Sequence, residues 1–206
     1  PAVSGGDVPY PLFVFAGLLA WTFFSNAISS AGQSVVGNQN LVTKVYFPRL
    51  MIPLSAVGAG LVDFVIGFAM LVLLMFGYGR YPGWGLCLVP LLLLALVMAA
   101  LGVGILLSAL TVAYRDFRHA LPFLVQLWMF ATPTIYMQAE TIVGPRGQLI
   151  LPLNPAYGII RNFRQAVLGG PLDLYSLGVS LAVSVVVLGL GCLYFRRVER
   201  TFADII

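Results

Sequence analysis

Long apolar runs, interrupted by a single charged residue in the second run, alternate with short polar connections along this chain. A transmembrane helix needs about 20 apolar residues, because each residue advances about 1.5 Å across about 30 Å of hydrocarbon. Five continuous runs meet this requirement, and they predict an all-α polytopic membrane protein. The runs are Leu12–Ser30, Leu54–Tyr78, Leu86–Leu110, the stretch between His119 and Glu140, and Leu174–Phe195.

The composition supports a membrane protein. Hydrophobic residues make up 60% of the 206 positions and charged residues only 9%, whereas a soluble domain carries about 25% charged residues. The net charge is +4, but the basic residues are scattered between apolar runs and form no patch. The basic balance therefore does not indicate nucleic-acid binding.

Five spans would place the two ends of the chain on opposite sides of the membrane. One set of connections holds seven basic residues and the other holds four, which predicts a cytoplasmic C-terminus. The richer set is Lys44, Arg49, Arg115, Arg118, Arg196, Arg197 and Arg200; the poorer set is Arg80, Arg146, Arg161 and Arg164. The chain starts at Pro1, without Met and in a polar stretch. We therefore expect residues 1–206 to be a single transmembrane domain from a longer protein.

The connection from Gly37 to Pro53 carries a possible short helix. Asn40 is a plausible N-cap, and residues 41–47 could form two turns that end at Pro48. Such a helix would lie at the membrane interface or dock into a partner. The alternative is an ordinary basic loop anchored by Tyr46 and Phe47. The next connection on this side, Ala113–Leu121, carries YRDFRHALP, which indicates either contacts to another chain or simple interfacial anchoring.

The fourth run contains Pro133, which should kink or break its helix. After an external segment, Asn154-Pro155 predicts an N-cap and first helical residue, and Gly169-Gly170 predicts the stop. The predicted helix, Ala156–Leu168, is about 20 Å long and too short to span. It is amphipathic, with Arg161 and Arg164 on its polar face. We expect it to dip into the outer leaflet or to lie on it.

Asp63 and the aromatic residues are the candidates for function inside the spans. A charge at the centre of a membrane helix costs about 2.5–3.5 kcal/mol on insertion scales, so Asp63 should face protein or water. It is either a pathway residue or a hydrogen-bond anchor between helices. Aromatic rings could stack on sugars along a conduit, or they could form ordinary packing and interfacial belts. These aromatic candidates are Trp21, Phe24, Trp128 and Tyr136.

The sequence holds no recognisable catalytic, metal-binding or nucleotide-binding motif. His119 is the only histidine, and no HExxH or phosphate-loop pattern is present. We therefore expect neither catalysis nor a metal or nucleotide cofactor in this chain.

Four ordered segments resemble the transmembrane subunit of bacterial ABC-2 type exporters. The branch that they resemble most exports polysaccharides and polyol phosphates, such as O-antigen, capsule and teichoic acid. The segments are NLVTKVYFPRLMIP, ALTVAYRDFRHALPFLVQLWMFATPTIYM, NPAYGIIRNFRQAVLGG and RVERTFADII. The family has six spans after an N-terminal amphipathic helix. The resemblance therefore implies that this stretch lacks that helix and the first span.

The resemblance also implies a mechanism. Two permease subunits form a channel, and two separate ATPase subunits, which bind ATP and Mg²⁺, move short cytoplasmic coupling helices. By position, the main coupling helix matches Asn40, Leu41, Lys44, Tyr46, Phe47 and Arg49, and the second contact matches Tyr114, Arg115, Asp116 and Arg118. The external helix containing Asn154, Arg161 and Arg164 matches the exit region. The implied glycan path is assigned to Trp21, Phe24, Asp63, Trp128 and Tyr136.

The expected function is export of lipid-linked polysaccharide across the bacterial inner membrane, with membrane lipid as the surroundings. One alternative is an ABC-2 exporter of drugs or small lipids, which the YFPR and YRDFRHALP motifs disfavour. The other is an ion-coupled transporter or an intramembrane enzyme. Those proteins need clusters of ionisable residues in the membrane, and Asp63 is alone.

Overall fold

The computed structural model describes residues 9–39, 48–81, 83–114, 116–132 and 150–199. Every regular element in these ranges is a helix, which confirms the predicted all-α class. The long helices are α1 (Tyr10–Gly37), α3 (Met51–Gly77), α4 (Val89–Ala113) and α8 (Leu174–Glu199). The shorter elements are η1 (Trp84–Leu88), α5 (Phe117–Ala131), η2 (Leu151–Leu153) and α7 (Tyr157–Leu168).

Four helices in the described part of the chain are long and apolar enough to cross a membrane: α1, α3, α4 with η1, and α8. They correspond to the first, second, third and fifth predicted runs. Much of their outer surface is apolar, including Val65 on α3, Leu94 on α4 and Val186 on α8. Lipid can cover such faces where water could not, so the chain is a multi-pass membrane protein.

The described residues contain four such helices and not the five spans that were predicted. The fourth predicted run corresponds to α5, which has 15 residues and is therefore about 22 Å long. The helix ends at Ala131, two residues before Pro133. The preceding residue, Thr132, has left the helical region, with φ of −109° and ψ of 106°, as expected for a residue before proline.

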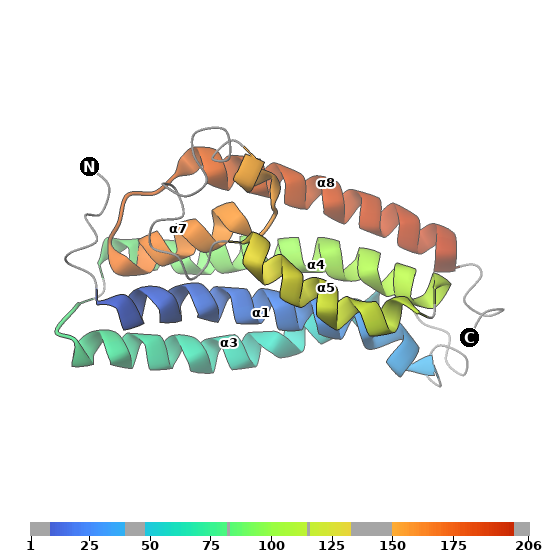
Figure 1. The fold of residues 1–206 in the computed structure, drawn as a ribbon, viewed down its shortest axis with the longest axis horizontal. Helices are drawn as coiled ribbons and strands as arrows, with labels where there is room; N and C mark the ends of the chain where they lie inside the picture. The colour runs from blue at the N-terminus through green and yellow to red at the C-terminus, as the bar shows by residue number, and fades with distance from the viewer. Residues whose placement is uncertain (1–8, 40–47, 82, 115, 133–149, 200–206) are drawn as a thin grey trace.

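The short helices α5 and α7 together extend along the length of the bundle (Figure 1). Figure 1 shows α5 running from one end of the bundle towards its middle, and α7 continuing from the middle to the other end. We call the latter the α7 end; α1 and α8 begin there and α3 ends there. The other is the Arg49 end, where α8 ends beside Arg49. The first helix therefore begins at the α7 end of the bundle, and the last helix ends at the Arg49 end (Figure 1).

Small residues let the long helices approach closely. A Cβ on Gly104 of α4 would lie 2.7 Å from the Cβ of Ala31 on α1, and one on Gly191 of α8 would lie 2.8 Å from the carbonyl oxygen of Gly102. Such close backbone packing is typical of helices that associate in lipid. The α7 helix enters the same core, where the ring of Phe163 packs edge-on against Phe64 of α3.

Candidate functional site

A polar contact joins α7 to the start of α8. The side chain of Asn162 is fully buried. Its amide nitrogen donates to the carbonyl oxygens of Gly158 (2.7 Å) and Asp173 (3.0 Å), and its oxygen accepts from the backbone nitrogen of Asp173 at 2.8 Å. The carboxylate of Asp173 then accepts from the backbone and hydroxyl of Ser176, at 3.1 and 2.6 Å. Asp173 thus satisfies free N–H groups at the start of α8, as an N-cap does.

A second contact ties α5 and η2 to the same helices. The backbone nitrogen of Gly158 donates to the Ser180 hydroxyl at 3.0 Å, and that hydroxyl lies 3.0 Å from the carbonyl oxygens of Pro152 and Asn154. The amide of Asn154 donates to the Thr132 hydroxyl at 2.7 Å. We call the set Asn162, Asp173, Ser176, Ser180, Gly158, Asn154 and Thr132 the α7–α8 clamp. Its polar side chains link the end of α5, η2, α7 and the start of α8 inside the bundle.

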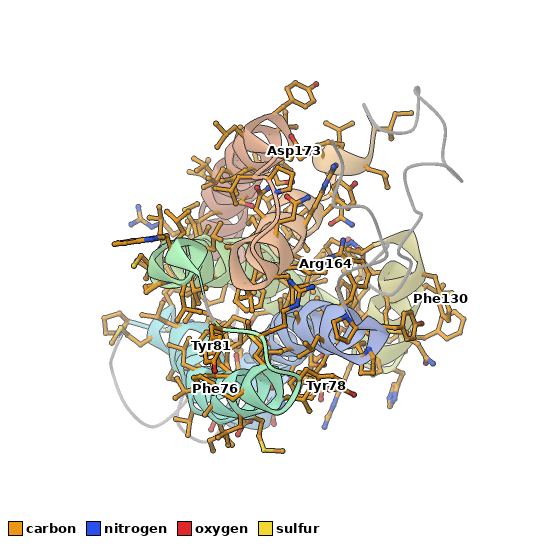
Figure 2. The ribbon with its side chains drawn as sticks, turned by 90° about the vertical axis from the view of Figure 1, so that its left-hand side faces the viewer. Phe76, Tyr78, Tyr81, Phe130, Arg164 and Asp173 are labelled. Carbon is orange, nitrogen blue, oxygen red and sulfur yellow. The ribbon has the colours of Figure 1, made fainter. Side chains whose placement is uncertain are left out.

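The residues predicted for the external helix lie in or beside this clamp. Asn154 was predicted to be an N-cap; its side-chain oxygen accepts from the backbone nitrogen of Ala156 at 3.1 Å, just before α7 begins. Arg161 forms an ion pair of 2.9 Å with Asp173. The guanidinium carbon of Arg164 lies 3.9 Å from the centre of the Phe13 ring on α1. Figure 2, which views the bundle from the α7 end, shows Arg164 near its middle.

The pKa of Asp173 reflects these contacts. Burial by itself raises the pKa, but the hydrogen bonds from Ser176, the charge of Arg161 and a further backbone bond outweigh burial and lower the pKa below its ordinary value. The carboxylate is therefore held in its charged form, which keeps the pair with Arg161 intact.

The structure shows how the short helix packs against the rest of the protein. Eight of the 12 residues of α7 are buried, and α7 packs against α1, α4, α8 and η1. It therefore inserts into the bundle and does not lie on its surface. A Cβ on Gly158 would overlap the backbone of Ser176, so the absence of a side chain there allows the insertion.

The predicted coupling residues lie partly outside the described residues: Asn40, Leu41, Lys44, Tyr46, Phe47 and Arg115. Arg49 is described, and its guanidinium donates to the carbonyl oxygen of Glu199 at the end of α8, at 2.6 Å. Tyr114, Asp116 and Arg118 are exposed where α4 ends and α5 begins. The structure thus places the described members of both predicted contacts at the Arg49 end.

The predicted path residues do not share one surface. The ring of Phe24 lies 5.8 Å from that of Trp21 and 5.6 Å from that of Trp128, centre to centre. Trp21 and Phe24 are buried and serve as packing between helices. Asp63 is exposed on α3 and makes no hydrogen bond to any residue that the structure describes. Tyr136 lies outside the described residues.

Sequence reasoning missed two polar groups. Ser176, Ser180 and Ser184 repeat every fourth residue and form one buried face of α8, a spacing that predicts a close helix contact. Thr22, Asn26 and Ser30 also repeat every fourth residue, on α1, but they are exposed. In the described part of the chain their side chains have no hydrogen-bond partner.

Comparison with known proteins shows the family of the chain. Residues 4–168 match the ABC-2 type transporter family. The chain is 31% identical over 196 residues to the O-antigen export system permease protein RfbA of Myxococcus xanthus, covering 95% of this chain and 75% of that protein. It is 26% identical over 201 residues to a protein of the same name from Klebsiella pneumoniae, covering 96% and 76%. The chain belongs to the ABC-2 type transporter family.

Proposed function

We propose that this protein is the permease subunit of an ATP-driven exporter that moves lipid-linked polysaccharide of the O-antigen type across the bacterial inner membrane. The observation that carries the proposal is the similarity to O-antigen export permeases over 95% of the chain. It includes the segment that forms α7 and the α7–α8 clamp, and not the apolar spans alone.

Two copies of the protein would form the transporter with two ATPase subunits, which bind ATP and Mg²⁺. The Arg49 end has the properties of the docking face for the ATPase. Besides Tyr114, Asp116 and Arg118, it exposes Arg196 and Arg197 in the last turns of α8. Clustered basic residues next to spans favour the cytoplasmic side, where ATP is available. The C-terminus would then be cytoplasmic.

Deletion of the gene tests the function. Surface polysaccharide should disappear, and its lipid-linked form should accumulate inside the cell; the gene supplied in trans should restore export. Immunoblots of intact and lysed cells separate the two pools. Unchanged surface polysaccharide, combined with increased sensitivity to drugs, would replace this proposal by the drug-exporter alternative.

Two exposed tyrosines at opposite ends test the docking face. Tyr114 lies at the Arg49 end and is 62% exposed, and Tyr81 lies at the α7 end and is 81% exposed. Tyr114→Ala should weaken binding of the ATPase subunit and reduce substrate-stimulated ATP hydrolysis, whereas Tyr81→Ala should leave both unchanged. Co-purification and ATPase assays in proteoliposomes measure these effects. Equal effects of the two variants would contradict the assigned docking face.

A further inference from the structure

One outer face of the bundle carries five exposed polar side chains, interspersed with apolar ones, at the depth where a membrane protein is normally apolar. The five polar side chains are Thr22, Asn26 and Ser30 on α1, together with Asp63 on α3 and Gln126 on α5. All five side chains are exposed, and none has a hydrogen-bond partner among the residues that the structure describes. We call this set the polar track.

The three residues on α1 form a line along the helix. They are spaced by four, so they lie one above another over about 12 Å. The opposite side of α1 carries Ala27 and Ala31, which are buried, and Ala31 faces Gly104 of α4. The polar line therefore points away from the core. Of the four long helices, α1 has the lowest hydropathy, although half of its most apolar window is buried.

Packing contacts place Asp63 beside this line. On α3, Gly60 lies against Phe23 and Gly67 against Leu19 of α1. Asp63 is three residues after Gly60 and four before Gly67, so it lies next to both on the helix surface. Because the two helices are antiparallel, Asp63 is level with the stretch between Leu19 and Phe23. The carboxylate thus stands at the height of Thr22.

A similar register places Gln126 on the other flank. Leu121 of α5 lies against Gly32 of α1, and Trp128 packs edge-on against Phe24. Counting along these antiparallel helices puts Gln126 level with about Asn26. The side of α5 that faces α4 carries Leu124, Leu127 and Ala131, which line an apolar groove, and Gln126 lies on its other side.

The polar track therefore runs along α1, with α3 on one side and α5 on the other. Figure 2 shows α1 lying between α3 and α5, with Phe130 on the outer side of α5. Both α3 and α5 pack on α1. Lipid chains against this face would leave two amides, two hydroxyls and a carboxylate without partners in hydrocarbon, which is unfavourable.

We propose that the polar track is the surface along which the glycan chain crosses the membrane; this rests on the proposed export of polysaccharide. Sugar hydroxyls both donate and accept hydrogen bonds. The amides and hydroxyls of the track also donate and accept hydrogen bonds, and the Asp63 carboxylate accepts hydrogen bonds from sugar hydroxyls. A single polar anchor would suffice for helix packing, whereas an array of five groups suits a hydrated chain that slides past. Two copies with these faces turned towards each other would enclose a polar passage.

Cysteine labelling in the assembled transporter tests the surface. Cys87 and Cys192 are first replaced by Ser. Thr22→Cys, Asn26→Cys and Ser30→Cys should then react with a charged, water-soluble thiol reagent at least about tenfold faster than Val65→Cys, because the reactive thiolate forms only in contact with water. Val65 is the matched control: it is exposed, lies two residues from Asp63 and points to the other side of α3.

The same variants test the route. Only cysteine variants that export polysaccharide before labelling are used. Labelling Asn26→Cys should then block the appearance of polysaccharide at the surface, and labelling Val65→Cys should not. Asn26→Leu should reduce the export rate at least about fivefold, with Val65→Leu unchanged, because a partner for the sugar hydroxyls is lost.

The outcomes separate the two proposals. Export that is independent of the gene would end the proposed function. Export that requires the gene, combined with labelling at Asn26 as slow as at Val65, would overturn the polar track alone. Fast labelling at Asn26 with undiminished export would also overturn it, since water would reach the track and glycan would not use it.

Discussion

The bundle contains two polar regions, and they differ in whether their side chains have partners. In the α7–α8 clamp, Asn162 forms three hydrogen bonds and the carboxylate of Asp173 is bound by Ser176 and Arg161. On the polar track, Asn26 and its neighbours have no partner in the described residues. The comparison teaches that a polar side chain in a membrane helix can be stable in two ways. It either forms its hydrogen bonds within the protein, where it fixes the structure, or it forms them with a hydrophilic ligand or water.

The largest expected effect comes from Gly158→Val. The new side chain would overlap the backbone of Ser176 and approach the Ser180 hydroxyl, which is 2.6 Å from an ideal Cβ. Because backbone cannot move aside as a side chain can, we expect a loss of at least about 3 kcal/mol or displacement of α7. SDS-induced unfolding in mixed micelles measures the change. Gly178→Ala is the control, since a Cβ there meets nothing within 4 Å. Equal stability of the two variants would mean that α7 is not inserted.

The second effect comes from Asn162→Ala. The substitution removes three hydrogen bonds and leaves the backbone of Asp173 without its partner. A buried polar group without a partner costs about 1–3 kcal/mol, so we expect a loss of about 2 kcal/mol. Thermal denaturation in detergent reports it, and limited proteolysis should become faster in the segment after α7. A loss of stability below about 0.5 kcal/mol, the range typical of surface substitutions, would show that the hydrogen bonds of Asn162 do not stabilise the fold.

These two regions also show how far the sequence could be interpreted. The long helices follow from length and apolarity, because lipid leaves a charge-free run of 20 residues few alternatives to a helix. The predicted fourth span is not continuous in the described residues, because α5 ends at Ala131, two residues before Pro133. The burial of α7 could not be derived from its amphipathic pattern, since Arg161 and Arg164 suggest a surface helix until their partners Asp173 and Phe13 are known.

The candidate site was harder to predict than the fold. Aromatic residues drew attention, yet Trp21 and Phe24 are buried packing residues. The more informative signal was the spacing of Thr22, Asn26 and Ser30. A spacing of four shows that these residues share a face, but it does not show whether that face is buried. The serines of α8 have the same spacing and are buried. Only the packing of neighbouring helices distinguishes the two cases.

A smaller, pH-dependent effect is expected from Asp173→Asn. The pKa of Asp173 is lowered in the folded protein, so its carboxylate contributes stability above its ordinary value of 3.8, and that contribution is lost as the pH falls through the lowered pKa. The partly exposed pair with Arg161 should be worth under about 1 kcal/mol. Melting temperatures should therefore differ between wild type and variant at pH 7, with the difference shrinking below pH 3.8. Ser176→Ala should shift that window upwards. A constant difference across this range would show that the charge of Asp173 does not stabilise the fold.

The smallest effect on stability is expected at the polar track, and it gives the sharpest contrast with the clamp. Asn26→Leu removes no hydrogen bond within the described structure, and the side chain is exposed. The free energy of unfolding should therefore stay within about 0.5 kcal/mol of wild type. Asn162→Leu, the same substitution in the clamp, should behave as Asn162→Ala. SDS-induced unfolding of both variants side by side measures the contrast. If Asn26→Leu destabilised the protein as much as Asn162→Leu does, Asn26 would serve the fold, and the distinction between satisfied and open polar groups would not hold.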